Sequence, residues 1–194
     1  MNNSSGDSLA KRILDVTAAG MLLVLLAPLL AVIALAVRLT SPGPVFYRQS
    51  RVGKGERSFQ MLKFRSMVRN ADAIGSWFTD PDDPRITLLG KILRSTSLDE
   101  LPQLINVFRG EMSLVGPRPD VPAQLANYSQ EERRIILSVR PGITGLAQVM
   151  GRSRLSAQGR TNYNVYYALY RNLLLDLKIL LRTIWVVGSR RGTN

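Results

Sequence analysis

An uncharged apolar segment near the amino terminus limits what this chain can fold into more than any other feature. The segment Val16–Val37, VTAAGMLLVLLAPLLAVIALAV, runs for 22 residues without a charged side chain. As one helix it would be about 33 Å long, close to the thickness of the hydrocarbon core of a bilayer. No cleavage site of the A-x-A type ends a short apolar core, so we do not interpret the segment as a removed signal peptide. We therefore expect the chain to associate with a membrane.

Pro28 divides this segment into 12 residues before it and 9 after it. A proline inside a helix removes one backbone hydrogen bond and clashes with the preceding turn. Two topologies stay open: one kinked helix that spans the membrane, or two short helices that enter and leave by the same face. The first 15 residues carry Lys11 and Arg12 against Asp7 and Asp15. The positive-inside rule therefore places only the carboxy-terminal body, which it puts on the cytoplasmic side.

The rest of the chain is long enough for one domain with a sizeable core, since the sequence has 194 residues. It contains neither cysteine nor histidine. This composition excludes disulfides, thiolate nucleophiles, Ser-His triads and most zinc sites. Catalysis, if present, is expected to use carboxylates, lysine, arginine, tyrosine or a hard metal ion.

The net charge of +12 is unevenly distributed along the chain. After Glu132, Asp176 is the one acid among eleven Lys and Arg residues. Such a surface favours anionic partners, namely nucleic acid, phosphorylated metabolites or acidic lipid headgroups. Charge alone does not choose among the three.

From Thr40 onward, turn signals alternate with short apolar runs, which is typical of a small globular body. Strands are predicted near Val45–Gln49 and Phe59–Phe64, joined by the loop Gly53–Gly55. This loop lacks the G-x-x-x-x-G-K-[ST] spacing, so we do not interpret it as a P-loop.

Helices are predicted in the remaining body, so the fold class expected is α/β and mostly helical. The stretch 85–97 places Leu89, Ile92 and Leu93 on one helical face. The tail, LLLDLKILLRTIWVV, is either a core helix or a helix that lies in the membrane interface. Further helices are expected over 101–109, ended by Gly110, and over 131–139.

Two adjacent acids, Asp99 and Glu100, stand in the stretch RSTSLDELPQL. A structural interpretation is that the S-x-x-E pattern from Ser97 is a capping box at the start of a helix. Pro102 would then lose a hydrogen bond, whereas a cap at Asp99 would place it where no bond is lost. Capping and chemistry both stay open at this point.

The chemical interpretation depends on the surroundings of the acid pair. A helix amino terminus is expected to lower a carboxylate pKa and to attract phosphate. An ionised carboxylate can attack phosphorus only where cations neutralise the phosphate, and Lys63, Arg94 and Arg118 could supply that charge. Mg²⁺ would suit the pair because it takes oxygen ligands and often only one or two from protein.

Five blocks follow one another in fixed order along the sequence. The blocks are KFRSM (63–67), DPRIT (83–87), TSLDELPQLINVFRGEMSLVGPRP (96–119), VRPGITGLAQVMGR (139–152) and LLLDLKILLRTIWVV (173–187). With these blocks the chain closely resembles the bacterial sugar transferase family, the monotopic phosphoglycosyl transferases, over nearly its whole length.

The resemblance implies transfer of a sugar 1-phosphate from a UDP-sugar to undecaprenyl phosphate, with release of UMP. This is a first membrane step of polysaccharide or glycoconjugate synthesis at the cytoplasmic face of the bacterial inner membrane. The reaction is expected to be ping-pong, through a phosphosugar attached to Asp99. Glu100 would assist, the two acids would hold Mg²⁺, and Lys63, Arg94 and Arg118 would bind the phosphates.

The resemblance also implies a re-entrant membrane helix at residues 1–39, broken at Pro28, and a catalytic domain at residues 40–194. That domain is expected to be small and membrane-associated, with a short β-hairpin and amphipathic interfacial helices. Membrane lipids are expected partners, nucleic acid is not, and a homo-oligomer stays open. The family breaks this helix at a Ser-Pro pair, whereas this chain has Ala27-Pro28.

Three further departures follow the acid pair. Leu146 stands where the family usually has tryptophan, Met150 where it has asparagine, and Asn164 where it has aspartate. The loss of that aspartate indicates either a different donor sugar or a weak or inactive enzyme. A rival from another class is a basic, membrane-anchored scaffold that binds acidic lipid or nucleic acid without catalysis.

Overall fold

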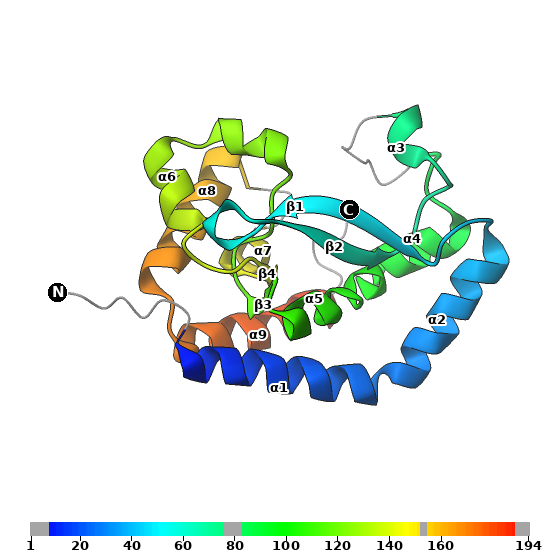
Figure 1. The fold of residues 1–194 in the computed structure, drawn as a ribbon, viewed down its shortest axis with the longest axis horizontal. Helices are drawn as coiled ribbons and strands as arrows, with labels where there is room; N and C mark the ends of the chain where they lie inside the picture. The colour runs from blue at the N-terminus through cyan, green and yellow to red at the C-terminus, as the bar shows by residue number, and fades with distance from the viewer. Residues whose placement is uncertain (1–7, 76–82, 152–154, 189–194) are drawn as a thin grey trace.

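The computed structural model describes residues 8–75, 83–151 and 155–188 (Figure 1). The described chain is mostly helical and contains two small sheets of two strands each. The helices are α1 Leu9–Leu25, α2 Ala27–Thr40, α3 Ala71–Ile74, α4 Leu88–Ser95, α5 Gln103–Arg109, α6 Gln130–Ile136, α7 Leu146–Met150, α8 Ala157–Tyr170 and α9 Leu173–Gly188. The strands are β1 Phe46–Val52, β2 Ser58–Phe64, β3 Ser113–Val115 and β4 Gly142–Thr144, and short 3₁₀ turns include η2 Leu98–Glu100.

The predicted β-hairpin is confirmed. Strands β1 and β2 pair antiparallel, from Phe46 opposite Phe64 to Val52 opposite Ser58. Gly55, in the connecting turn, has a φ of 62°, which a glycine adopts without strain. The second sheet, a parallel pair of β3 and β4, was not predicted because each strand has only three residues.

The apolar segment forms two helices with a bend of 64° between them. Among the described residues no single helix is long and apolar enough to cross a bilayer, but α1 and α2 together are. The bend lies at Leu26, and Pro28 occupies the first turn of α2, where its missing N–H is tolerated. Figure 1 shows the pair as a wide V whose open side faces the rest of the molecule.

Helix α1 is fixed to the body by polar contacts on its inner face. Asp15, which is buried, accepts hydrogen bonds from Ser113 Oγ at 2.8 Å and from the Leu114 N–H at 3.2 Å. Arg12 donates to the backbone carbonyls of Val107 at 2.8 Å and Phe108 at 3.1 Å. These contacts, at separations of more than 90 residues, hold α1 against α5 and β3.

The core has two parts. The larger packs α1, the hairpin, α5, β3, α8 and α9 around residues such as Met61, Val107 and Tyr167, all at most 2% exposed. The smaller joins α2 to the hairpin and α4 through Val37, Phe64 and Leu93, while Ile33 also belongs to it.

Several predicted details differ in the structure. Ile92 does not share the buried face of Leu93, because it is 59% exposed on the outer side of α4. Helix α5 begins at Gln103 rather than at residue 101, and it ends as predicted at Gly110, which has a φ of 91°. The tail helix α9 packs into the core through Ile179, which confirms the core alternative, whereas Leu181 on the same helix is 60% exposed. That α9 lies in the membrane interface stays a prediction.

Candidate active site

The acid pair lies in η2, a single 3₁₀ turn between α4 and α5. Ser97, just before the turn, has a left-handed backbone with a φ of 58° and makes no side-chain cap. Helix α5 has Pro102 at its N-cap and no side-chain cap either. Both capping interpretations of the sequence are therefore wrong, because the chain turns at Ser97 instead of continuing into a helix.

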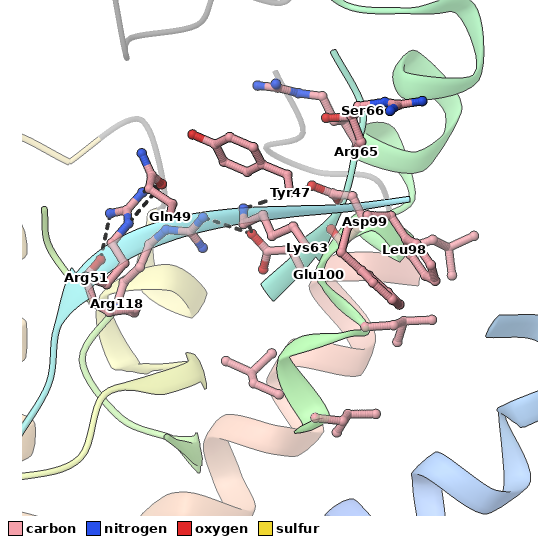
Figure 2. Close-up of a pocket in the computed structure, with 18 of the residues that line it drawn as sticks. Tyr47, Gln49, Arg51, Lys63, Arg65, Ser66, Leu98, Asp99, Glu100 and Arg118 are labelled. Atoms are coloured by element: carbon pink, nitrogen blue, oxygen red, sulfur yellow. Dashed lines mark hydrogen bonds and ion pairs between the residues drawn. The ribbon is translucent and has the colours of Figure 1, made fainter. Parts of the chain in front are cut away.

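Glu100 is held between two cations. Its Oε1 atom accepts a hydrogen bond from Lys63 Nζ and another from Arg118 Nη2, each at 2.8 Å (Figure 2). Lys63 comes from β2, and Arg118 comes from the proline-flanked loop after β3. These two positive charges hold the pKa of Glu100 far below its usual value despite the burial of the carboxyl. Glu100 is therefore ionised at neutral pH.

Asp99 is in a different environment. Its side chain is mostly buried, and its contact with Lys63 is longer, 4.0 Å between Oδ2 and Nζ. Burial raises the pKa of Asp99 above its ordinary value of 3.8, and this effect exceeds the opposing effect of Lys63. The sequence predicted a lowered pKa from a helix amino terminus, and that prediction is wrong because η2 is only a single turn and the carboxyl is buried.

A large pocket brings the predicted residues together. Its volume is about 1680 Å³, and Lys63, Asp99, Glu100, Arg94 and Arg118 all line it. Arg94, in the last turn of α4, is half-buried and is in none of the ion pairs among the described residues. Its charge still acts on the site, because it lowers the pKa of Asp99.

Apolar side chains also line this pocket. They come from α1, α5, β3, β4, α7 and α9 and from Leu26 at the bend, so the pocket reaches from the charged pair to the bent helix pair. These apolar residues are Leu22, Leu26, Leu104, Leu114, Ile143, Ala147, Leu180 and Ile184.

The sequence did not single out Arg51, which lies beside Arg118 in the pocket. Its guanidinium donates to Gln49 Oε1 at 2.6 and 3.0 Å and to the Pro119 carbonyl at 2.8 Å. Burial lowers the pKa of Arg51 to about 10, with a further contribution from Arg118, and it stays charged at neutral pH. The pairing of β1 with β2 places Arg51 on the pocket side of the hairpin. Tyr47 pairs with Lys63, and alternate residues of β1, 47, 49 and 51, share the face of Lys63.

The three departures from the family pattern lie in different surroundings. Asn164 is 4% exposed in α8 and lines the pocket. Leu146 is partly buried against the larger core, whereas Met150 is 41% exposed. Asn164 is therefore the departure that can affect a ligand directly.

A family model described as bacterial sugar transferase matches residues 6–190. The chain belongs to the bacterial sugar transferase family. Its relatives include a UDP-glucose:undecaprenyl-phosphate glucose-1-phosphate transferase of Caulobacter vibrioides, which is 46% identical over 91% of this chain and 68% of the relative. The exopolysaccharide production protein ExoY of Sinorhizobium fredii is 40% identical over 95% and 88%.

Other relatives are longer than this sugar transferase. A UDP-glucose:undecaprenyl-phosphate glucose-1-phosphate transferase of Escherichia coli is 42% identical over 94% of this chain but only 41% of its own length. The matched part of that relative therefore corresponds to nearly all of the chain described above.

The donor atoms available to a metal in this sugar transferase are carboxylate oxygens. The described residues hold no group of three or more His, Cys, Asp and Glu side chains placed to bind a metal ion. Asp99 and Glu100 offer two adjacent carboxylates in a pocket lined by cations. Such a set does not suit zinc, but it fits Mg²⁺, which takes one or two protein carboxylates and completes its shell with phosphate and water oxygens.

Proposed function

We propose that this sugar transferase moves a sugar 1-phosphate from a UDP-sugar to undecaprenyl phosphate and so initiates the synthesis of a bacterial polysaccharide. The single observation that carries the proposal is the match of the chain, nearly end to end, to relatives named for this reaction. The named relatives differ in their sugars, among them glucose and N-acetylgalactosamine, so the proposal covers the reaction class and leaves the sugar open.

In the first half-reaction, an oxygen of ionised Asp99 attacks the phosphorus that carries the sugar. A new Asp99–O–P bond forms, and the P–O bond to the other phosphate breaks. The electron pair of that bond leaves with UMP. In the second half-reaction, an oxygen of undecaprenyl phosphate attacks the same phosphorus, the bond to Asp99 breaks, and the carboxylate is regenerated.

The two acids are suited to different roles. The contact of Asp99 with Lys63 is longer than that of Glu100. Burial disfavours the negative charge of Asp99, and this charge is neutralised when the carboxylate forms a bond to phosphorus. Glu100 is already committed to Lys63 and Arg118, so it orients these cations toward the phosphates. Arg94 adds positive charge on the side of Asp99. Electrostatic stabilisation of this kind is usually the largest contribution to phosphoryl transfer.

Mg²⁺ is part of the proposal. Asp99 and Glu100 would hold it, and when bound it would supply charge neutralisation to the diphosphate of the donor.

We further propose that α1 and α2 form a re-entrant hairpin and that the catalytic body, residues 40–194, lies on the cytoplasmic face of the inner membrane. Arg12 near the start of α1 bonds α5, while the end of α2 bonds Arg65 just after β2. Both ends of the bent pair thus contact the same body, an arrangement that suits entry and exit by one face.

A trapping experiment tests the proposal. The protein in detergent is mixed with a UDP-sugar and Mg²⁺ without acceptor, quenched, digested and analysed by mass spectrometry. We expect a sugar-phosphate adduct on the peptide that contains Asp99, together with release of UMP. Asp99→Asn should give no adduct, and Glu131→Gln, an exposed carboxylate on α6, should behave like the native chain. Formation of product without an adduct at Asp99 would refute the mechanism.

A further inference from the structure

Arg65 is a buried cation that the mechanism above does not use. It follows β2 directly, is 7% exposed and lines the same pocket as Asp99. Its Nη2 atom donates to the Ser41 carbonyl and to Ser41 Oγ, each at 2.6 Å, and to the Val37 carbonyl at 3.3 Å. Arg65 thereby fixes the end of α2 to the hairpin.

Only one of its three nitrogen atoms is used in this way. Arg65 Nε and Nη1 are buried without a hydrogen-bond partner among the described residues. A guanidinium N–H that is buried without a partner costs free energy, so such groups are rare unless a ligand or water completes them. The two nitrogens therefore point to an acceptor that binds at this position.

The surroundings of Arg65 are positive. Arg38 Nη1 donates to the Gly43 carbonyl at 3.1 Å, and Arg69 extends past the same glycine. Arg65 Nη1 occupies the space that a side chain at Gly43 would fill, and Gly43 has a φ of 127°. Burial has the largest lowering effect on the pKa of Arg65, Arg38 and Arg69 lower it further, and no carboxylate opposes them. An anion with more than one charge is the ligand that such a group of arginines favours.

The position of these arginines indicates which anion binds. Lys63 and Arg65 are two residues apart along an extended chain, about 7 Å, and alternate residues share a face. Figure 2 shows Arg65 and Arg118 on opposite sides of Lys63. Arg65 binds the end of α2, and Arg38 and Arg69 are next in the sequence to Leu39 and Val68, whose side chains are exposed. This place suits a phosphate group that arrives on a lipid.

We propose that Arg65, with Arg38 and Arg69, binds the phosphomonoester of the acceptor lipid and holds it near the phosphosugar on Asp99. The inference rests on the proposed function, because it assigns a site to the second substrate of that reaction. A phosphomonoester carries about two negative charges at neutral pH and offers oxygens to several donors at once, whereas a glycerophospholipid phosphodiester carries one.

Separate measurement of the two half-reactions tests the proposal. The first half, adduct formation from the donor alone, is followed by UMP release, and the second by transfer from the preformed adduct to undecaprenyl phosphate in nanodiscs. Arg69→Gln removes an exposed charge that takes no part in the cap of α2, and Arg65→Lys keeps the charge but loses most of the donors. Each should raise the acceptor KM on the order of tenfold, the effect of losing a charge-assisted hydrogen bond, and leave adduct formation unchanged.

Arg57→Gln is the matched control, since Arg57 is an exposed arginine at the opposite end of the same hairpin. It should change neither half-reaction. An unchanged acceptor KM in both Arg65→Lys and Arg69→Gln, with folding confirmed by thermal melting, would overturn the inference and leave the proposed function intact. Weaker membrane binding to phosphatidylglycerol nanodiscs with an unchanged acceptor KM would also overturn it, because the arginines would then bind lipid headgroups in general. Failure of the native chain to form an adduct would instead refute the proposed function.

Discussion

At the scale of residues, Asp99 and Glu100 have the same chemical group and opposite environments. Lys63 and Arg118 stabilise the charge of Glu100, whereas burial opposes the charge of Asp99. Two adjacent carboxylates with pKa values moved in opposite directions are a frequent mark of divided roles in catalysis. Substitution of each acid should therefore have a different effect on stability.

Asp99→Asn should abolish adduct formation and raise the melting temperature. The folded-state pKa of Asp99 lies above its ordinary value of 3.8, so ionisation costs stability at neutral pH. This cost decreases as the pH falls through the folded pKa, and it is gone below the ordinary value. A neutral amide of the same shape avoids the cost at neutral pH. A lower melting temperature for Asp99→Asn would contradict this account of the burial.

Glu100→Gln is the matched comparison and should lower the melting temperature. Because the pKa of Glu100 is lowered, the charge of Glu100 stabilises the fold at pH values above 4.5, the ordinary pKa of a glutamate. We expect a loss on the order of 1–2 kcal/mol, less than for a fully buried pair because Arg118 is 44% exposed. Thermal melts of both variants in the same detergent provide the measurement.

The pH dependence of the first half-reaction should respond to Lys63. Among the groups that lower the pKa of Asp99, Lys63 has the largest effect. Lys63→Gln should therefore raise that pKa further and move the acid limb of the kcat/KM profile to higher pH. Lys91→Gln, on the exposed side of α4, is the control and should leave the limb where it is. The idea fails if both variants keep the native profile.

At the scale of elements, the bend between α1 and α2 has more than one cause. Pro28 removes one helical hydrogen bond, whereas the body holds α1 through Asp15 and Arg12 and holds α2 through Arg65. Restoring one helical bond is worth about 1 kcal/mol, and a buried carboxylate with two hydrogen bonds is worth more than that. The contacts with the body should therefore dominate the topology.

Accessibility labelling can separate these causes. A cysteine introduced at position 5 should react only from the cytoplasmic side in the otherwise native chain, which has no cysteine of its own. In Pro28→Ala, this cysteine should be labelled from the outer side in a minor fraction of the molecules. Pro28→Ala combined with Asp15→Leu should expose a much larger fraction, because α1 is then also released from β3. Equal labelling in the single and double variants would show that the body does not hold α1.

Local sequence was sufficient to predict some elements and not others. The hairpin was predictable because Gly53 and Gly55 separate two runs of strand-forming residues. Strands β3 and β4 are too short for a periodic signal, and they pair only when residues 113–115 and 142–144 meet in space. The five candidate site residues could be named from their motifs. The burial of Asp99 and the unpartnered nitrogens of Arg65 depend on packing against distant segments, so no local pattern predicts them.

At the scale of the whole molecule, membrane attachment could depend on burial of apolar side chains in lipid or on attraction of the basic surface to acidic headgroups. Large apolar side chains are exposed on α1, α2 and α9, and burial of each in lipid is worth about 1.5–3 kcal/mol. They include Leu9, Ile13, Met21, Val24, Leu25, Val32, Leu35, Leu39, Leu174, Leu181, Ile184 and Trp185. In 1 M salt, by contrast, the screening length falls to about 3 Å, which removes most surface electrostatic attraction.

A salt wash of isolated membranes distinguishes the two sources of attachment. We expect the protein to stay in the membrane pellet at high salt and to be released only by detergent. Release by salt alone would mean that the basic surface carries the attachment, and it would favour the non-catalytic scaffold. Immunoblots of pellet and supernatant are sufficient for this measurement.

The ion pair of Lys11 with Asp176, at 2.9 Å, has a consequence for biosynthesis. Lys11 leaves the ribosome before its partner in α9, which follows 165 residues later along the chain. The inner face of α1 is covered by α5 and β3 as well as by α9, so its protein cover is complete only after all three have been made. We therefore expect the helix pair to meet the membrane before the pocket around Asp99 is complete. A translation pause before α9 should then leave nascent chains that are attached to the membrane but inactive.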